Sequence, residues 1–130
     1  MSRGFRQRWR ERGSRIVRLT LSFDDIMEFA LALLALSPDE LRGLGWTLAD
    51  RKRLLNRLLA SGRQAQRVDP QELGQTRLTI RIRAGEVAKL QAFAVKELPK
   101  AASNAAMLDR ALAALRSATD ANDVEDGEPG

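Results

Sequence analysis

The chain has 130 residues, of which 44% are hydrophobic and none is cysteine or histidine. This composition predicts one ordinary domain or two small packed units, and it excludes disulfides, thiol or histidine catalysis and the usual zinc ligand sets. Five of the 17 acidic side chains lie in the last eleven residues, so residues 1–119 carry 22 basic against 12 acidic side chains, a net charge of +10. The positive charge of residues 1–119 favours a polyanionic partner. We expect this partner to be nucleic acid rather than, as the second possibility, an anionic membrane surface.

Residues 1–15 form a basic arm that shows neither a helical nor a strand period. Such an arm is expected to be flexible, and either to lie along phosphates or to remain a solvated tail. It lacks the apolar segment of a secretory signal, and the longest apolar run, residues 29–36, is too short for a bilayer, which takes about 20 residues. We therefore expect a soluble, cytoplasmic protein without membrane association. The arginines of the arm are Arg3, Arg6, Arg8, Arg10, Arg12 and Arg15.

Residues 16–23 (IVRLTLSF) alternate between apolar and polar side chains, which predicts a β-strand. Its polar face would carry Arg18, Thr20 and Ser22. A helix is expected to begin at Asp24 and Asp25, where carboxylates suit the positive end of the helix dipole. Because this helix is apolar nearly all round, we expect it to be buried on most sides, in a core or a subunit interface.

Two capping signals follow this helix. Ser37, Pro38 and Glu40 predict a short helical turn that ends at the glycines of residues 43–45, with Trp46 as a core residue. Thr47 then predicts the start of a longer helix that reaches about residue 60 and presents its leucines to a core. Residues 61–75 are polar and contain Gly and Pro, which indicates a linker.

The second half repeats this plan. Residues 76–83 (TRLTIRIR) alternate again, and the tetrapeptides RLTL (18–21) and RLTI (77–80) share the same phase. An amphipathic helix is expected as far as Pro99, and Ser103 caps a last helix that ends near residue 116. Residues 118–130 are expected to be an acidic, disordered tail. Strand, helix, turn and capped helix thus occur twice, in residues 16–60 and 76–117.

A lone strand leaves its backbone edge unpaired, so we expect the two strands to form one antiparallel ribbon on the four helices. Two-stranded ribbons enter the major groove of DNA, where arginine reads guanine and hydroxyl groups contact either kind of base. The expected base-reading residues are Arg18, Thr20, Ser22, Arg77, Thr79 and Arg81. Phosphates are expected at the N–H groups that begin the second helices, at Thr47, Ser103 and Asn104, and at Arg83.

This layout resembles the ribbon-helix-helix family of DNA-binding proteins, which has the fold of the Arc and MetJ repressors. The likeness is strongest over residues 76–116, from TRLTIRIR to LDRALAALR, and includes GWTLADRKRLL in the first half. Most members dimerise to complete the ribbon, so two tandem copies imply a mainly helical fold in which one chain forms its own pseudo-dimer. The chain would be a monomer or a homo-oligomer on DNA.

Two functions of different classes are therefore expected. Tandem members of the family look like accessory proteins of conjugative transfer, which bind the plasmid transfer origin beside a relaxase. Single-repeat members are mostly repressors and antitoxins. The first expectation is sequence-specific binding of double-stranded DNA, in plasmid transfer with a relaxase or another transfer protein as partner, or in transcriptional repression. The second is an antitoxin or inhibitor that binds a toxin or another protein through the apolar first helix or the acidic tail.

The same residues also have interpretations that involve no specific function. The arginines of the strands can be ordinary solvated residues of half-buried edge strands. Asp24 and Asp25 are explained as helix-start residues without an acid–base pair. The sequence shows no catalytic, cofactor-binding or metal-binding constellation, so we expect neither an enzyme nor a bound cofactor or metal.

Overall fold

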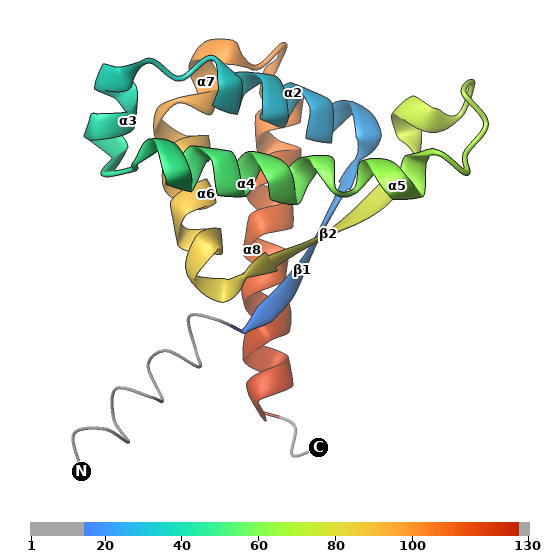
Figure 1. The fold of residues 1–130 in the computed structure, drawn as a ribbon. Helices are drawn as coiled ribbons and strands as arrows, with labels where there is room; N and C mark the ends of the chain where they lie inside the picture. The colour runs from blue at the N-terminus through green and yellow to red at the C-terminus, as the bar shows by residue number, and fades with distance from the viewer. Residues whose placement is uncertain (1–14, 128–130) are drawn as a thin grey trace.

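The structure is a computed structural model that describes residues 15–127, with the side chains of residues 15–118. It is mainly helical and contains one two-stranded antiparallel sheet, as the sequence predicts (Figure 1). The first half comprises β1 (Ile16–Ser22), α2 (Phe23–Leu34), α3 (Pro38–Leu44), α4 (Leu48–Leu59) and α5 (Gly62–Ala65). The second comprises the 3-10 turn η1 (Leu73–Gln75), β2 (Arg77–Arg83), α6 (Ala84–Lys96), α7 (Leu98–Ala101) and α8 (Ala105–Gly127).

The two strands form a ribbon whose apolar face is buried. Leu19 lies opposite Ile80, and Thr20 lies opposite Thr79. The inward side chains are each at most 3% exposed, which confirms the predicted alternation: Val17, Leu19, Leu21, Leu78, Ile80 and Ile82. Each strand has seven residues and leads directly into a helix. Arg18 and Thr79 each precede the start of the following helix by five residues, so they occupy equivalent positions. The tetrapeptides RLTL and RLTI therefore present the same residue types to the same face, but they are displaced by two residues relative to the helices.

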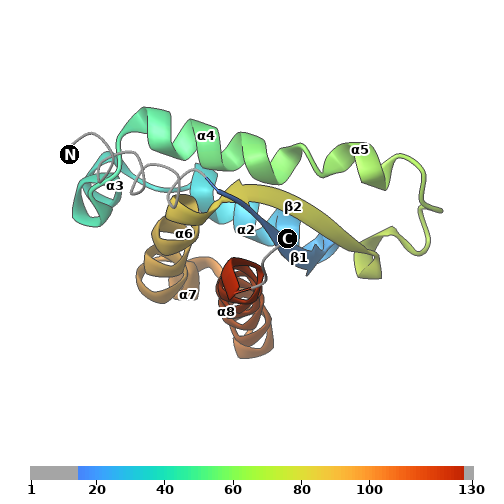
Figure 2. The ribbon, with the colours of Figure 1, turned by 90° about the horizontal axis from the view of Figure 1, so that it is seen from below.

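The ribbon lies at one side of the helices, between α4–α5 and α8 (Figures 1 and 2). Aromatic rings fill the space between the first helices of the two halves. The ring centroids of Phe29 and Phe93 are 5.2 Å apart, and those of Trp46 and Phe93 are 5.9 Å apart. All three residues are buried. This confirms Trp46 as a core residue and joins both halves in one apolar core.

The predicted capping signals are confirmed in α3 and α4. Ser37 Oγ accepts the N–H of Glu40, and Glu40 Oε1 accepts the N–H of Ser37. Gly45 ends α3 in the left-handed region, with φ of 75°, which glycine adopts at little cost. Thr47 and Asp50 form the same reciprocal pair at the start of α4. These local bonds explain why two helices begin where the sequence indicates.

The first helix is buried on most sides, as expected, except along one outer stripe. Leu31 and Leu34 of α2 are 59% and 53% exposed, and Leu48 and Leu59 at the two ends of α4 are also exposed. The elements that pack most closely against α2 are β1, η1, α4 and α7, and they leave its outer side open.

The segment predicted as a linker is partly structured, because residues 61–75 contain α5 and η1. The short helix α7, with Pro99 in its first turn, was not expected either. The last helix, which the sequence predicts to end near residue 116, continues to Gly127. Neither proline nor glycine interrupts the sequence between residues 105 and 126, so no strong helix breaker ends the helix earlier. None of the helices between residues 15 and 127 has the length and apolar character that crossing a membrane requires.

Candidate nucleic-acid interface

The outward face of the ribbon gathers the predicted base-reading residues. Arg18 lies opposite Arg81, Thr20 opposite Thr79, and Ser22 opposite Arg77. Residue 83 continues this face at the end of β2. The arginines at positions 18, 77, 81 and 83 are exposed, whereas Thr20, Ser22 and Thr79 are half-buried. The structure therefore brings together on one surface all six residues that the sequence predicts for reading bases.

The arginines of this face have no carboxylate partner among the described residues. Among the described residues, none of Arg18, Arg77, Arg81 and Arg83 forms an ion pair. By contrast, six cations elsewhere each have a carboxylate partner: Arg42, Arg53, Arg57, Lys89, Lys100 and Arg110. Like charges directly opposite each other on neighbouring strands are destabilising. The ribbon thus concentrates positive charge that no described carboxylate neutralises.

The outer edge of β2 is covered by a side chain from the predicted linker. Gln64 Nε2 donates a hydrogen bond to the carbonyl of Thr79 at 2.8 Å, and Gln64 Oε1 accepts the N–H of Thr79 at 3.2 Å. The side-chain amide thus bonds both backbone groups of Thr79, as the backbone of a third strand would, at the middle of the ribbon. Within the described part of the chain, the hydroxyl groups of Thr20 and Thr79 make no hydrogen bond, so they remain available to a ligand.

Ser22 has a structural role that the strand pattern did not indicate. Its Oγ accepts the N–H of Asp25 at 3.2 Å, which makes Ser22 the N-cap of α2. The hydroxyl can still donate its own proton, but its position is set by the helix start. We therefore regard Ser22 as a weaker base-reading candidate than the two threonines.

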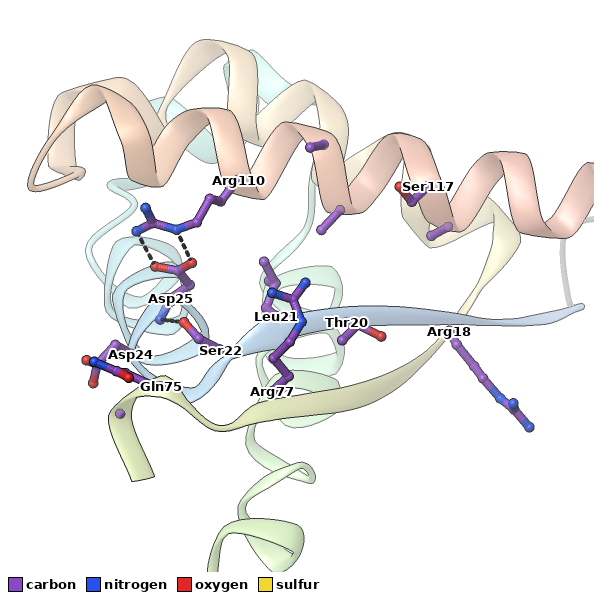
Figure 3. A pocket seen from close by; sticks show the side chains of 14 residues that line it. Arg18, Thr20, Leu21, Ser22, Asp24, Asp25, Gln75, Arg77, Arg110 and Ser117 are labelled. Carbon is purple, nitrogen blue, oxygen red and sulfur yellow. Dashed lines mark hydrogen bonds and ion pairs between the residues drawn. The ribbon is translucent and has the colours of Figure 1, made fainter. Parts of the chain in front are cut away.

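An ion pair with a buried carboxylate and a half-exposed arginine lies beside this cap and was also not foreseen. Asp25 is 3% exposed, and its two carboxylate oxygens accept hydrogen bonds from Nε and Nη2 of Arg110 at 2.7 and 2.9 Å (Figure 3). These bonds raise the pKa of the Arg110 guanidinium. The sequence identifies Asp25 only as a helix-start residue, because its partner lies far along the chain in α8.

A second buried carboxylate occupies the matching position in the other half. Glu86 is the third residue of α6, as Asp25 is of α2. Its Oε1 accepts the N–H of Arg83 at 2.8 Å and lies 3.4 Å from Nε of Arg57 in α4. Each carboxylate therefore faces an arginine from the other half of the chain.

The predicted phosphate contact at Thr47 is not available as expected. The N–H of Thr47 donates to Asp50 Oδ2 at 2.9 Å, and this bond, ahead of the nearby Lys89 and Arg53, lowers the pKa of Asp50. A negative charge therefore already occupies the start of α4. A phosphate there would meet the carboxylate of Asp50.

The start of α8 is occupied in the same way. The N–H of Ser103 donates to Glu28 Oε1, and Asn104 Oδ1 accepts the N–H of Met107 at 2.9 Å. Asn104, and not Ser103, therefore caps α8. This end of α8 lies beside α7, and the helix passes the ribbon only farther along its length (Figure 1). The structure does not bring Ser103 or Asn104 to the ribbon, whereas Arg83 does lie on its outward face.

Grooves lie on both sides of the ribbon. The groove beside α8 has a volume of about 680 Å³, and its lining combines arginines of the ribbon with Asp24, Asp25 and Arg110. Figure 3 shows Arg77 reaching toward this groove while Arg18 points away from it. The groove beside α4 has a volume of about 380 Å³, and Thr79 and Arg81 form part of its lining. The exposed face is thus continuous with two recesses of different charge.

Most of the predicted basic arm lies outside the described residues, including Arg3, Arg6, Arg8, Arg10 and Arg12. Arg15 is described and half-buried, and its carbonyl accepts the N–H of Ala84 at 2.7 Å. This bond extends the pairing of the two strands by one residue.

No family model, curated protein or solved structure matches the chain. Its function therefore has to be argued from the ribbon and from the helices beside it.

Proposed function

We propose that the protein is a sequence-specific double-stranded DNA-binding protein that reads the major groove with its ribbon. The observation that carries the proposal is the set of four exposed arginines without an ion pair among the described residues. Within this set, Arg18 lies directly opposite Arg81. A passive surface gains nothing from opposed like charges, whereas a polyanion relieves their repulsion and releases its own counterions.

The side chains of this face suit recognition of bases as well as attraction to phosphate. Arginine can donate two parallel hydrogen bonds to guanine, and threonine can contact either kind of base. Arg18, Arg77 and Arg81 surround Thr20 and Thr79 on a ribbon of the width that enters the major groove. We therefore assign base reading to these five residues.

We also propose that the chain is a tandem ribbon-helix-helix protein that completes its ribbon within one molecule. Two strands of seven residues each lead into a helix with a buried carboxylate at its third position. The ion pairs of Asp25 with Arg110 and of Glu86 with Arg57 both connect one half to the other. This reciprocal arrangement supports an intramolecular pseudo-dimer. Light scattering, combined with a distance measured between spin labels on the two strands, tests it, and strands that pair only between chains would refute it.

A role in conjugative transfer, at a plasmid origin beside a relaxase, agrees with the tandem organisation, and repression of transcription is the second candidate within this class. An antitoxin or inhibitor that binds a protein is the alternative of a different class. The exposed leucines of α2 and the acidic end of the chain are the features that favour this alternative. A purified wild-type protein that binds no duplex would favour it over DNA binding.

Selection from a random duplex pool, followed by a gel-shift assay, tests the DNA-binding proposal. We expect the wild-type protein to enrich one sequence and the Arg77→Ala/Arg81→Ala variant to lose preference for it. Each lost base contact should cost about 1–3 kcal/mol. A variant whose sequence preference is undiminished would show that these arginines do not read bases.

A further inference from the structure

The groove between α4 and β2 is lined by cationic and amide side chains. Its lining includes Arg53, Asn56, Arg57, Gln64 and Arg81 and contains no carboxylate. Thr79 and Arg81 belong both to this groove and to the outward face of the ribbon, so the groove opens beside that face. The larger groove on the other side contains two carboxylates, and its Arg110 is already bonded to Asp25. Of these two grooves in the described part of the chain, the one beside α4 has no carboxylate in its lining.

Apart from Gln64, the cationic and amide donors of this groove are weakly bonded or unbonded within the described part of the protein. Arg81 forms no ion pair with the described residues, and the side-chain amide of Asn56 is exposed and makes no hydrogen bond to them. Arg53 is 46% exposed, and its contact with Asp50 is long at 3.4 Å. Nε of Arg57 is buried without a hydrogen-bond partner, although it lies near Glu86. An anion in the groove would satisfy donors that the fold leaves unmatched.

The opposite side of the ribbon is less accessible to a polyanion. There α8 runs past the ribbon and continues to Gly127 (Figure 1). A duplex bound to the ribbon would therefore lie closer to α4 than to α8. Shape and charge thus favour the same side.

We propose that the groove between α4 and β2 holds the phosphodiester backbone of one DNA strand, with Arg53 and Asn56 as its direct contacts. This inference rests on the proposed function, because a ribbon in the major groove has a phosphate backbone beside each of its edges. Arginine binds phosphate oxygens through paired N–H groups, and the amide of Asn56 adds a further donor. The phosphate site is therefore formed by the later part of α4, and not by its first turn at Thr47.

The test compares an Arg53→Gln/Asn56→Ala variant with a Lys96→Gln control. Lys96 is exposed near the far end of α6, and like the variant the control loses one positive charge. Fluorescence anisotropy would measure binding of a duplex selected by the wild-type protein and of a scrambled duplex over a range of salt concentrations. We expect the variant to bind both duplexes more weakly by the same factor. Its slope of log K against log salt should fall by about one, because a phosphate contact releases one counterion.

A conservative variant separates charge from folding. Arg53→Lys should keep a salt slope near that of the wild type, because it retains the charge at the same place. A salt slope of Arg53→Gln/Asn56→Ala equal to that of Lys96→Gln would overturn the groove assignment while leaving the ribbon as the reading surface. A variant that lost discrimination between the two duplexes would also overturn it, because phosphate contacts carry no sequence information. A wild-type protein that binds neither duplex would overturn the proposed function together with this site.

Discussion

Replacement of Arg81 by glutamine should change stability and DNA binding in opposite directions. Arg81 faces Arg18 across the ribbon, and neither forms an ion pair with the described residues. Glutamine keeps a long polar side chain but removes one of the two opposed charges. We therefore expect the free protein to become slightly more stable and its complex with DNA to become weaker.

The size of the stability change follows from the geometry of the ribbon. Side chains directly opposite each other have Cβ atoms about 4.5–5.5 Å apart, so two extended guanidinium groups are separated by about 7 Å. Two unit charges at that distance repel by about 0.6 kcal/mol in water, and physiological salt reduces this to about 0.3 kcal/mol. The loss of one base contact should cost about 1–3 kcal/mol of binding free energy, or about 5- to 150-fold in affinity.

Urea unfolding followed by circular dichroism measures the first effect, and fluorescence anisotropy with a selected duplex measures the second. The stabilisation should be larger at about 0.01 M than at about 0.15 M ionic strength, because the Debye length falls from about 30 to about 8 Å. Lys96→Gln serves as the control and should change neither quantity appreciably. A destabilised Arg81→Gln protein with unchanged DNA affinity would contradict this expectation, because it would give Arg81 a structural role.

Four further outcomes follow from the fold. Phe93→Ala should cost about 3–5 kcal/mol and leave a single unfolding transition by calorimetry, because its ring joins both halves of the core; two separate transitions would contradict this. Arg110→Ala should destabilise the protein more than Asp25→Ala in urea, since only the first leaves a buried carboxylate unpaired; the reverse order would be inconsistent with this ion pair. The N–H of Ser37, with Glu97 and Lys100 nearby, lowers the pKa of Glu40 from 4.5 to about 2. Because this pKa is depressed on folding, its contribution is present above pH 4.5 and is lost as the pH falls toward about 2. As the pH falls over that range, the urea midpoint of Glu40→Gln should therefore decrease less steeply than that of the wild type. An equal decrease in both proteins would show that Glu40 does not contribute to the pH dependence of stability. Truncation after Ala118 removes five carboxylates and should strengthen binding of both selected and scrambled duplexes in anisotropy, whereas unchanged affinities would show that this segment does not affect DNA binding.

The sequence predicts those parts of the fold that depend on neighbouring residues. Strict alternation identified both strands and the polar face that carries Arg18 and Arg81. The capping signals at Ser37 and Thr47 placed two helix starts, because each involves residues three positions apart. Such patterns are local, so a single sequence contains all the information that they need.

Contacts between distant residues were not predictable in this way. Gln64 lies in the segment predicted as a linker, but its side chain hydrogen-bonds the outer edge of β2 at Thr79. The pairing of Asp25 with Arg110 links α2 to α8. Neither contact produces a periodic signal along the chain. The phosphate contacts were predicted at helix starts on a general rule, and that rule takes no account of the bond from the N–H of Thr47 to Asp50.

The central claim is that the outward face of the ribbon reads double-stranded DNA. The most direct test is a comparison of wild-type protein with Arg18→Ala/Arg81→Ala on a selected and a scrambled duplex, by fluorescence anisotropy at one salt concentration. We expect the wild type to prefer the selected duplex and the ratio of the two affinities to fall toward one in the variant. An equal ratio in both proteins would contradict this expectation.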